Sequence, residues 1–371
     1  GNLSSASSGV SLAVDYVVPT ITVSSNRTSL IAGQTATLTA VLSEPSVNFV
    51  AGDITSVGGT IGAFSGSGSN YTFTFTPTAN STVAMSVSVV GGAFTDAVGN
   101  PNDASNTVTA TVDTAVPTVS SVSSSIANGA YKAGSVVDVS VVFTDAVTVQ
   151  TGGGTPTLAL NSAGGASATY VAGSGTNTLA FRYTVLASHT SSDLDYATVN
   201  SLALNLGTIR DSSGNDATVL LPTVGGASSL AGNKAIVIDT VAPTAPSGLV
   251  LTPVGGTVVS NTLLATSTNL TASANMTAGQ ATGGTANLLL GDTVLASDTS
   301  IGSTDTTLAF TLGLSTSSAL QSAIAAGGAV TVQLIDAAGN ISSSSASVTL
   351  IVDYVIPTVT LTASTSALRI G

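Results

Sequence analysis

A seven-residue motif that occurs four times constrains this chain more than any other feature. It consists of an aliphatic residue, Asp, three variable residues and Pro-Thr, and its copies span 14–20, 112–118, 238–244 and 352–358. Each copy ends a run of alternating apolar residues, and its proline cannot donate to a central β ladder. Repetition at such spacing is typical of an array of similar units. We therefore expect a row of small domains joined at these motifs.

A second motif, Asp-x-x-Gly-Asn, lies upstream of three of these junctions, at 96–100, 211–215 and 336–340. The chain also begins with Gly1-Asn2, which resembles the end of a fourth copy. Residues 1–15 align without gaps with 339–353, and residues 19–33 align likewise with 357–371, at a constant offset of 338 positions. We expect a parent protein that repeats a three-domain block, of which this chain is one block cut out of register.

Composition excludes several classes of function. Charged residues make up 6% of the chain, the formal net charge is −12, and Lys plus Arg total six, so nucleic acid and anionic membranes are poor partners. Without Cys and with a single His, the chain lacks disulfides and the usual ligands of transition metals. It has no apolar run long enough for a membrane-spanning helix.

Alternating apolar and polar residues predict the strands, because a half-buried strand repeats every two residues. The predicted strands are 34–42, 71–76, 85–90, 107–112, 136–143, 178–185, 234–238, 262–274, 286–290, 307–312 and 330–335. Ser caps and a Gly stop predict one short helix over 317–327. The predicted units are the last strand of a preceding domain (1–15), three complete domains (16–113, 114–239 and 240–353) and the start of a following domain (354–371). About seven short strands in 100 residues describe an immunoglobulin-like sandwich.

The combined motifs resemble the bacterial Ig-like repeats of large secreted surface adhesins, including biofilm-associated and type I-secreted repeat proteins. The resemblance rests on the Val-Asp-x-x-x-Pro-Thr junctions, the Asp-x-x-Gly-Asn loops and the segment from Ser25 to Thr39. Residues 129–134 and 192–197 are similar to a longer repeat type of the same proteins. The resemblance implies an all-β fold of tandem Ig-like sandwiches in an extended, end-to-end array. It also implies a stalk that is often stiffened by calcium.

Calcium is the cofactor that the acidic residues favour, because it takes six to eight oxygens from Asp, Asn and backbone carbonyls. In an Ig-like sandwich, the loop after the second strand and the loop before the last strand lie at the pole where the preceding domain ends. The candidate ligands therefore fall into one group per junction. They are Asp15, Glu44, Asp96 and Asn100; Asp113, Asp145, Asp211 and Asn215; Asp239, Asp336 and Asn340; and Asp353, which ends the last junction strand. The alternative is that each Asp-x-x-Gly-Asn motif is simply a turn.

Catalysis is a poor alternative. His189 is the sole histidine, and we expect it in a solvated loop. A hydrolytic triad would therefore have to include His189, with Ser188 and with Asp193 or Asp195. Asp193 and Asp195 could also form a glycosidase pair, but only Tyr196 lies beside them as a sugar platform. We therefore expect a loop or cation-binding role for both acids, and no enzyme.

The sequence favours a structural stalk segment of a bacterial cell-surface adhesin, located outside the cell. Its expected partners are neighbouring Ig-like repeats of the same or an identical chain and a cell-surface or matrix ligand. The main alternative is a subunit of a self-assembling surface layer or extracellular filament. A carbohydrate-binding accessory module is more distant, because exposed aromatic residues do not cluster in the sequence.

Overall fold

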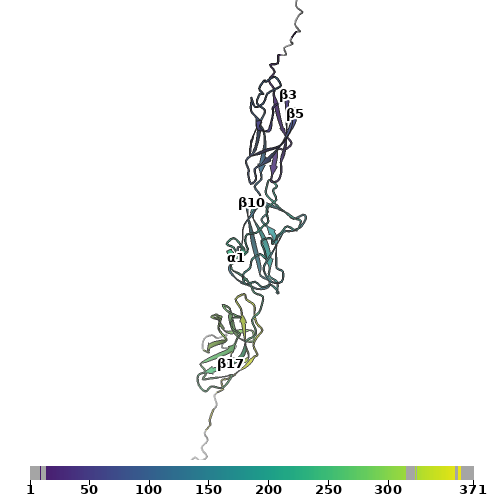
Figure 1. Cartoon of the computed structure of the whole chain (residues 1–371). Coiled ribbons are helices and arrows are strands. Elements are labelled where there is room, and N and C mark those ends of the chain that lie inside the picture. Colours follow the sequence, from purple (N-terminus) through teal and green to yellow (C-terminus); the bar gives the residue numbers. More distant parts are fainter. Residues whose placement is uncertain (1–8, 10–13, 315–321, 323, 356–357, 361–371) are drawn as a thin grey trace, which may run out of the picture.

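The computed structural model describes residues 9, 14–314, 322, 324–355 and 358–360, and these form three β-sandwich domains in an end-to-end row (Figure 1). Each domain has its own hydrophobic core, drawn from residues 21–112, 122–238 and 249–350. The predicted all-β fold in an extended array is confirmed. None of the described helices is long and apolar enough to cross a membrane.

The first domain pairs a three-stranded sheet with a four-stranded sheet. The first sheet has the order β1 (Ile21–Ser25), β3 (Ala36–Ser46) and β5 (Gly59–Pro77). The second has the order β2 (Ser29–Ile31), β7 (Val108–Asp113), β6 (Met85–Val89) and β4 (Ile54–Val57), and the short helix η1 (Ala51–Asp53) precedes β4. Alternate residues of β3 are buried, as the period of two predicts. The last strand, β7, pairs in parallel with β2 and ends at the junction Asp113.

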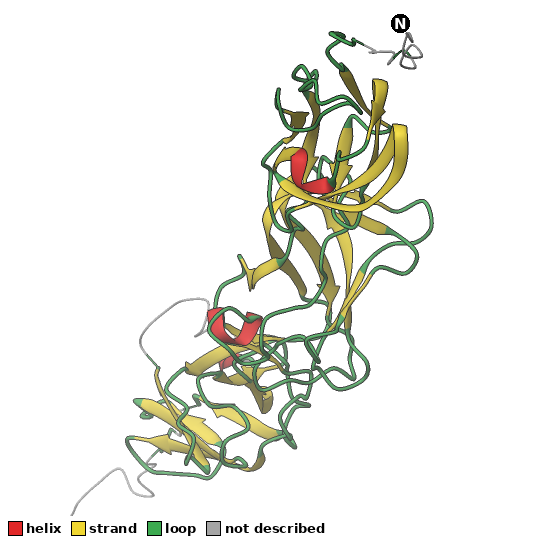
Figure 2. Ribbon diagram, turned by 45° about the horizontal axis from the view of Figure 1, so that its top comes forward, coloured by secondary structure: helices red, strands yellow, loops and turns green. Residues whose placement is uncertain are grey.

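The second domain is larger and is built around the long strand β10 (Val136–Gln150), which is labelled in Figure 1. Figure 2 shows that strands and loops make up almost all of the described chain, with only short helices. The remaining elements of the second domain are β8 (Val119–Ser124), β9 (Gly129–Tyr131), β11 (Thr157–Ala159), β12 (Ser167–Ala172), β13 (Thr176–Thr184), β14 (Leu202–Ala203), β15 (Thr208–Arg210), α1 (Leu230–Asn233) and β16 (Ile236–Ile238). The register of β10 against β13 shifts between Val142 and Val147, so β10 leaves the straight ladder before it pairs with β15. β16 pairs in parallel with β9 and leads into Asp239.

The third domain repeats the plan of the first. Its elements are β17 (Ser247–Val254), β18 (Thr262–Leu264), β19 (Asn269–Asn275), β20 (Thr285–Leu290), β21 (Thr293–Asp298), β22 (Thr307–Gly313), β23 (Gly328–Ile335) and β24 (Val348–Asp353). The single strand predicted over 262–274 is wrong, because a turn divides it. Ser267 closes that turn: its backbone N–H donates to Leu264 O, and its Oγ accepts from Leu264 N–H, each at 3.0 Å. β18 and β19 consequently join different sheets.

Three predictions concern segments at the edge of what the structure describes. The predicted last strand at 1–15 lies outside the described residues except for Gly9, Val14 and Asp15. The predicted helix at 317–327 falls mostly outside them, although Ser322, Ile324 and Ala325 are helical. Of the predicted start of a further domain, 354–371, only 354–355 and 358–360 are described.

Candidate domain-junction site

Each Asp-x-x-Gly-Asn motif folds into a tight loop around its own aspartate. In the first domain, Asp96 Oδ1 accepts hydrogen bonds from the backbone N–H groups of Val98, Gly99 and Asn100 at 3.0, 2.7 and 2.9 Å. Gly99 has φ 98°, a left-handed conformation that favours glycine. Asp211 binds Ser213, Gly214 and Asn215 in the same way, at 2.9, 2.7 and 2.8 Å. Turn formation thus accounts for the local sequence of the motif.

The asparagine of each motif also contacts the segment of chain that enters its domain. Its Nδ2 donates to the backbone carbonyl of the junction aspartate: Asn100 to Asp15 at 3.2 Å, Asn215 to Asp113 at 3.1 Å and Asn340 to Asp239 at 3.0 Å. The same Nδ2 donates to the motif aspartate, at 2.8, 2.7 and 2.9 Å respectively. The motif therefore joins two domains as well as turning the chain.

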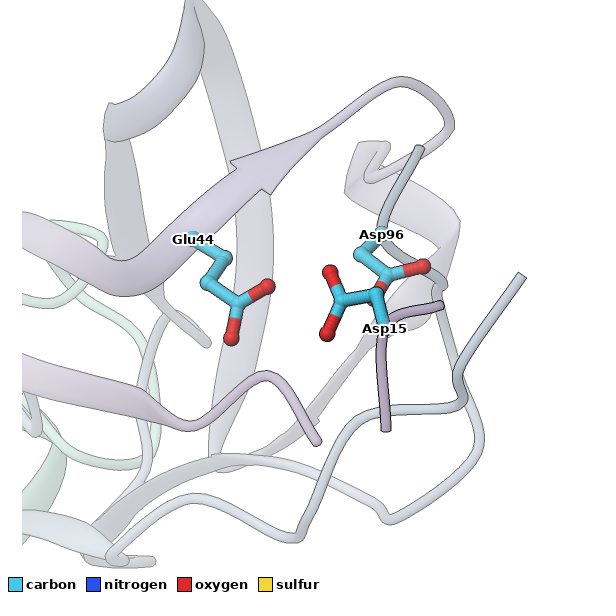
Figure 3. Close-up of side chains that lie close together, drawn as sticks. All are labelled: Asp15, Glu44 and Asp96. Atoms are coloured by element: carbon cyan, nitrogen blue, oxygen red, sulfur yellow. The ribbon is translucent and has the colours of Figure 1, made fainter. Parts of the chain in front are cut away.

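Three carboxylates meet at the first junction. One carboxylate oxygen from each of Asp15, Glu44 and Asp96 lies within 4.8 Å of the others, and the three side chains face one another (Figure 3). Asp15 comes from the incoming linker, Glu44 from β3, and Asp96 from the loop before the last strand. They converge at the pole that the Ig-like topology predicts. Such an oxygen-only donor set suits a hard cation.

The surroundings of Glu44 and Asp96 shift the pKa values of these two carboxyls in opposite directions. Burial raises the pKa of the Glu44 carboxyl above its usual value, and the charges of Asp15 and Asp96 raise it further. Burial also acts to raise the pKa of Asp96, but its hydrogen bonds from Asn100, Gly99 and Val98 outweigh this effect and lower the pKa overall. Asp96 is thus held in its ionised form, and Glu44 is the group whose charge is least favourable.

The second and third junctions are built differently. Among the residues that the structure describes, no other group of three acidic or imidazole side chains meets at this spacing. Asp113 Oδ2 instead accepts a hydrogen bond from Ser213 Oγ at 2.6 Å, and Asp145 is exposed, with Oδ1 accepting from Ala146 N–H at 2.7 Å. One contact is common to all four junctions: the Oδ1 of Asp15, Asp113, Asp239 and Asp353 accepts from the backbone N–H two residues further on, at 2.9, 3.1, 3.0 and 3.0 Å. Among the described residues, three acids of one predicted group meet only at Asp15, Glu44 and Asp96, and Asn100 of that group directs its Nδ2 at Asp96.

Several junction contacts were not predicted. Ala32 N–H of the first domain donates to Asn215 Oδ1 at 2.8 Å, and Lys132 Nζ of the second domain donates to Gly339 O at 2.8 Å. Thr114 Oγ1 donates to Thr78 O at 2.7 Å, back into the first domain. The sequence could have indicated the threonine contact, because the residue after the junction aspartate is Thr at Asp113 and Asp239 but Tyr at Asp15 and Asp353.

The residues considered for catalysis have structural roles. The prediction of a solvated His189 is wrong: it is 3% exposed, and its Nδ1 contacts Tyr183 Oη at 2.9 Å and accepts from Leu186 N–H at 3.2 Å. Asp195 is 1% exposed and accepts from the backbone N–H groups of Tyr196, Gly225 and Leu230. Burial, followed by the charge of Asp195, raises the pKa of Tyr196 to about 12. These contacts secure loops around the core of the second domain.

Comparison with known proteins gives a family likeness for the first domain. Residues 15–112 match the family described as "Bacterial Ig-like domain". The first domain is therefore similar to a bacterial Ig-like domain. The match begins at the junction residue Asp15 and ends at the last strand, β7, so this Ig-like domain includes the carboxylate cluster and the Asp96–Asn100 loop. No curated protein matches the chain.

Two solved structures are among those similar to the chain. One is the Yersinia pseudotuberculosis adhesin InvE, at 14% identity and a TM-score of 0.20, with the match covering 62% of this chain and 66% of the adhesin chain. The other is Dpr2 Ig1-Ig2 in complex with DIP-Theta Ig1-Ig3, at 9% identity and a TM-score of 0.23, covering 91% of this chain and all of that chain. Because both scores are low, the likenesses carry no conclusion about function.

Proposed function

We propose that the chain is a non-enzymatic stalk segment of a bacterial cell-surface adhesin, in which Ig-like domains separate an adhesive region from the cell. The observation that carries this proposal is the end-to-end row of three sandwiches with the same Asn-to-Asp contact at each junction. A repeated contact of this kind serves to hold an extended shape. The match of the first domain to bacterial Ig-like domains supports a location outside the cell.

We also propose that calcium binds at the first junction. The carboxylates of Asp15, Glu44 and Asp96 supply three hard oxygens, and a divalent cation there removes the repulsion that raises the pKa of Glu44. The residues fit the ion less well at the second junction, where the Ser213 hydroxyl donates a hydrogen bond to Asp113 Oδ2 and thereby occupies one carboxylate oxygen. Extracellular calcium modules bind with dissociation constants of about 10⁻⁴–10⁻³ M, and we expect an affinity in this range.

Calorimetric titration of the chain with calcium tests this site. We expect one binding event in the wild type that Glu44→Gln weakens strongly, because the variant keeps the shape of the side chain but loses its charge. The matched control is Asp193→Asn, which removes an exposed acid distant from the junctions in sequence and leaves binding unchanged. Equal binding in Glu44→Gln and the wild type would place calcium elsewhere.

Light scattering separates the stalk from a self-assembling lattice or filament. A stalk segment stays monomeric in calcium, because its junctions are satisfied within one chain. Growth of the particle mass on calcium addition contradicts the stalk. The partners of a stalk segment are the neighbouring Ig-like repeats of its own parent chain.

A further inference from the structure

The two junctions inside the chain share a set of hydrogen bonds that needs no metal. At the junction between the first and second domains, Asn215 uses both ends of its amide. Its Nδ2 donates to Asp113 O and Asp211 Oδ2, and its Oδ1 accepts from Ala32 N–H. The orientation of the amide is determined by its partners, because carbonyl and carboxylate oxygens only accept and a backbone N–H only donates. Asn215 is 2% exposed, so water competes poorly for these bonds.

The linker at this junction is held from both sides. Thr114 is 4% exposed, and its Oγ1 donates to Thr78 O at 2.7 Å and accepts from Ser81 N–H at 2.9 Å, which ties it to the first domain. Pro117 O accepts from Thr218 N–H at 2.8 Å, which ties the far end of the linker to the second domain. Only two residues remain between these anchors, so little freedom is left for bending.

The junction between the second and third domains repeats the arrangement with different atoms. Asn340 Nδ2 donates to Asp239 O, and Thr240 Oγ1 donates back to Ala187 O at 2.7 Å and His189 O at 3.0 Å. Lys132 stands at the position that Ile31 holds in the first domain, one residue before the counterpart of Ala32, and its Nζ donates to Gly339 O at 2.8 Å. The Gly339 carbonyl oxygen therefore accepts from the ammonium group of Lys132, in the preceding domain, and is not free to bind a cation.

The junctions at Asp15 and Asp353 have another sequence. Tyr16 and Tyr354 replace the threonine, and a tyrosine hydroxyl lies too far from its own backbone to make the short contact that a threonine Oγ1 makes. At Tyr16 the carboxylates of Asp15, Glu44 and Asp96 gather instead. Sequence and geometry therefore separate two types of junction, Asp-Thr and Asp-Tyr.

All three described junctions share the Asn contact, but only Asp113 and Asp239 add the threonine contacts. We propose that these threonine contacts fix the Asp-Thr junctions without metal, whereas the Asp-Tyr junction, represented by the cluster at Asp15, depends on a cation. A stalk built of such 338-residue blocks would have, in each block, two Asp-Thr junctions that are rigid without calcium and one Asp-Tyr junction that is rigid only with calcium bound. The proposal rests on the stalk function above, but its test is done without calcium. Failure of the calcium site and failure of the fixed joint are therefore distinguishable.

The experiment measures the distance distribution between spin labels in the full chain in EDTA. The chain has no cysteine, so Thr72→Cys and Thr169→Cys, at exposed strand positions of the first and second domains, give a single labelled pair. We expect one narrow distribution that calcium does not change. Asn215→Asp keeps the shape of the side chain but replaces the donor with a charge facing Asp211, and we expect it to broaden the distribution. The matched control Asn200→Asp, an exposed position of the same domain, leaves it narrow.

Hydrogen exchange separates loss of the joint from loss of the fold. In Asn215→Asp we expect fast exchange at Ala32, in the neighbouring domain, with the buried Val139 and Val141 of β10 still protected. Thr114→Val, which removes the hydroxyl bonded to Thr78 and Ser81 of the first domain, is the second variant and should also broaden the distribution. A wild-type distribution that is broad in EDTA and narrows with calcium overturns the proposal. Equally narrow distributions in the wild type and both variants overturn it as well.

Discussion

At the scale of single residues, the role of a side chain depends on the groups that it contacts. Asn100, Asn215 and Asn340 were expected to supply oxygen ligands to calcium, but in the structure each directs its amide N–H groups at acceptors. Glu44 has a different environment, since it is half-buried beside two further carboxylates. A single charge there affects both metal binding and pH dependence.

With calcium chelated, we expect the first domain to lose stability as pH rises. The folded-state pKa of Glu44 lies above its usual 4.5, so protonated Glu44 contributes stability that is fully present below 4.5 and is lost as pH rises through the folded pKa. Hydrogen exchange of first-domain amides in EDTA, from acidic to neutral pH, measures this loss. Glu44→Gln should abolish this part of the pH dependence. An unchanged profile in the variant would show that another group is responsible.

His189 should matter for the stability of the second domain and not for any reaction. Replacing it with Ala leaves the Leu186 N–H and the Tyr183 hydroxyl without their buried partner, which costs roughly 1–3 kcal/mol per group. Chemical unfolding of the chain measures this cost, and the other two domains should unfold as before. Tyr183→Phe is the milder comparison, because it keeps the Leu186 contact; an equal loss in both variants would contradict this account.

At the scale of elements, the larger second domain depends on one carboxylate to organise its loops. Asp195 accepts three backbone N–H groups from two separate loops, including that of Leu230 at the start of α1. α1 is a four-residue helix, too short to be stable by itself. Its position against β8 therefore depends on such tertiary contacts.

Asp195→Asn tests this dependence. The asparagine offers one acceptor oxygen in place of two, so at least one buried N–H loses its partner and we expect a loss of roughly 1–3 kcal/mol. Hydrogen exchange should rise first at Gly225 and Leu230. Protection of both amides at the wild-type level in the variant would show that other contacts hold the loop. Asp193→Asn is the control, since its side chain is exposed.

At the scale of the whole molecule, the two junction types predict where the stalk bends. The chain contains two Asp-Thr junctions between complete domains, whereas its Asp-Tyr junctions lie at its ends. Chelation of calcium should therefore change the shape of this chain little. The effect of calcium should appear only when a second block follows.

Appending a second copy of residues 16–353 directly after Asp353 creates that case, because Asp353-Tyr354 matches Asp15-Tyr16. We expect small-angle scattering to show a shorter maximum dimension in EDTA than in calcium for the doubled chain. The single chain should give the same dimension in both. Shortening of the single chain in EDTA would contradict the assignment of its internal junctions as metal-independent.

The sequence alone determined the fold class, a part of the strands and the place of the first acidic cluster. The alternation of buried and exposed residues in β3 and the repeated junction motifs depend only on neighbouring residues. They can therefore be recognised without knowing how the sheets pack. The convergence of Asp15, Glu44 and Asp96 follows from topology, because all three lie at one pole of one domain. The division of 262–274 by the Ser267 turn was missed, because both halves have the same alternating pattern.

The tertiary structure decided which junctions gather their acids and which are closed by hydrogen bonds. Asp145 lies within the register shift of β10, whose course depends on pairing with β13 and not on the local sequence. The burial of His189 depends on Tyr183 from a neighbouring strand. The Ala32 and Lys132 contacts depend on how one domain is rotated against the next. Contacts between separate loops depend on distances of a few ångströms, which side-chain periodicity does not encode.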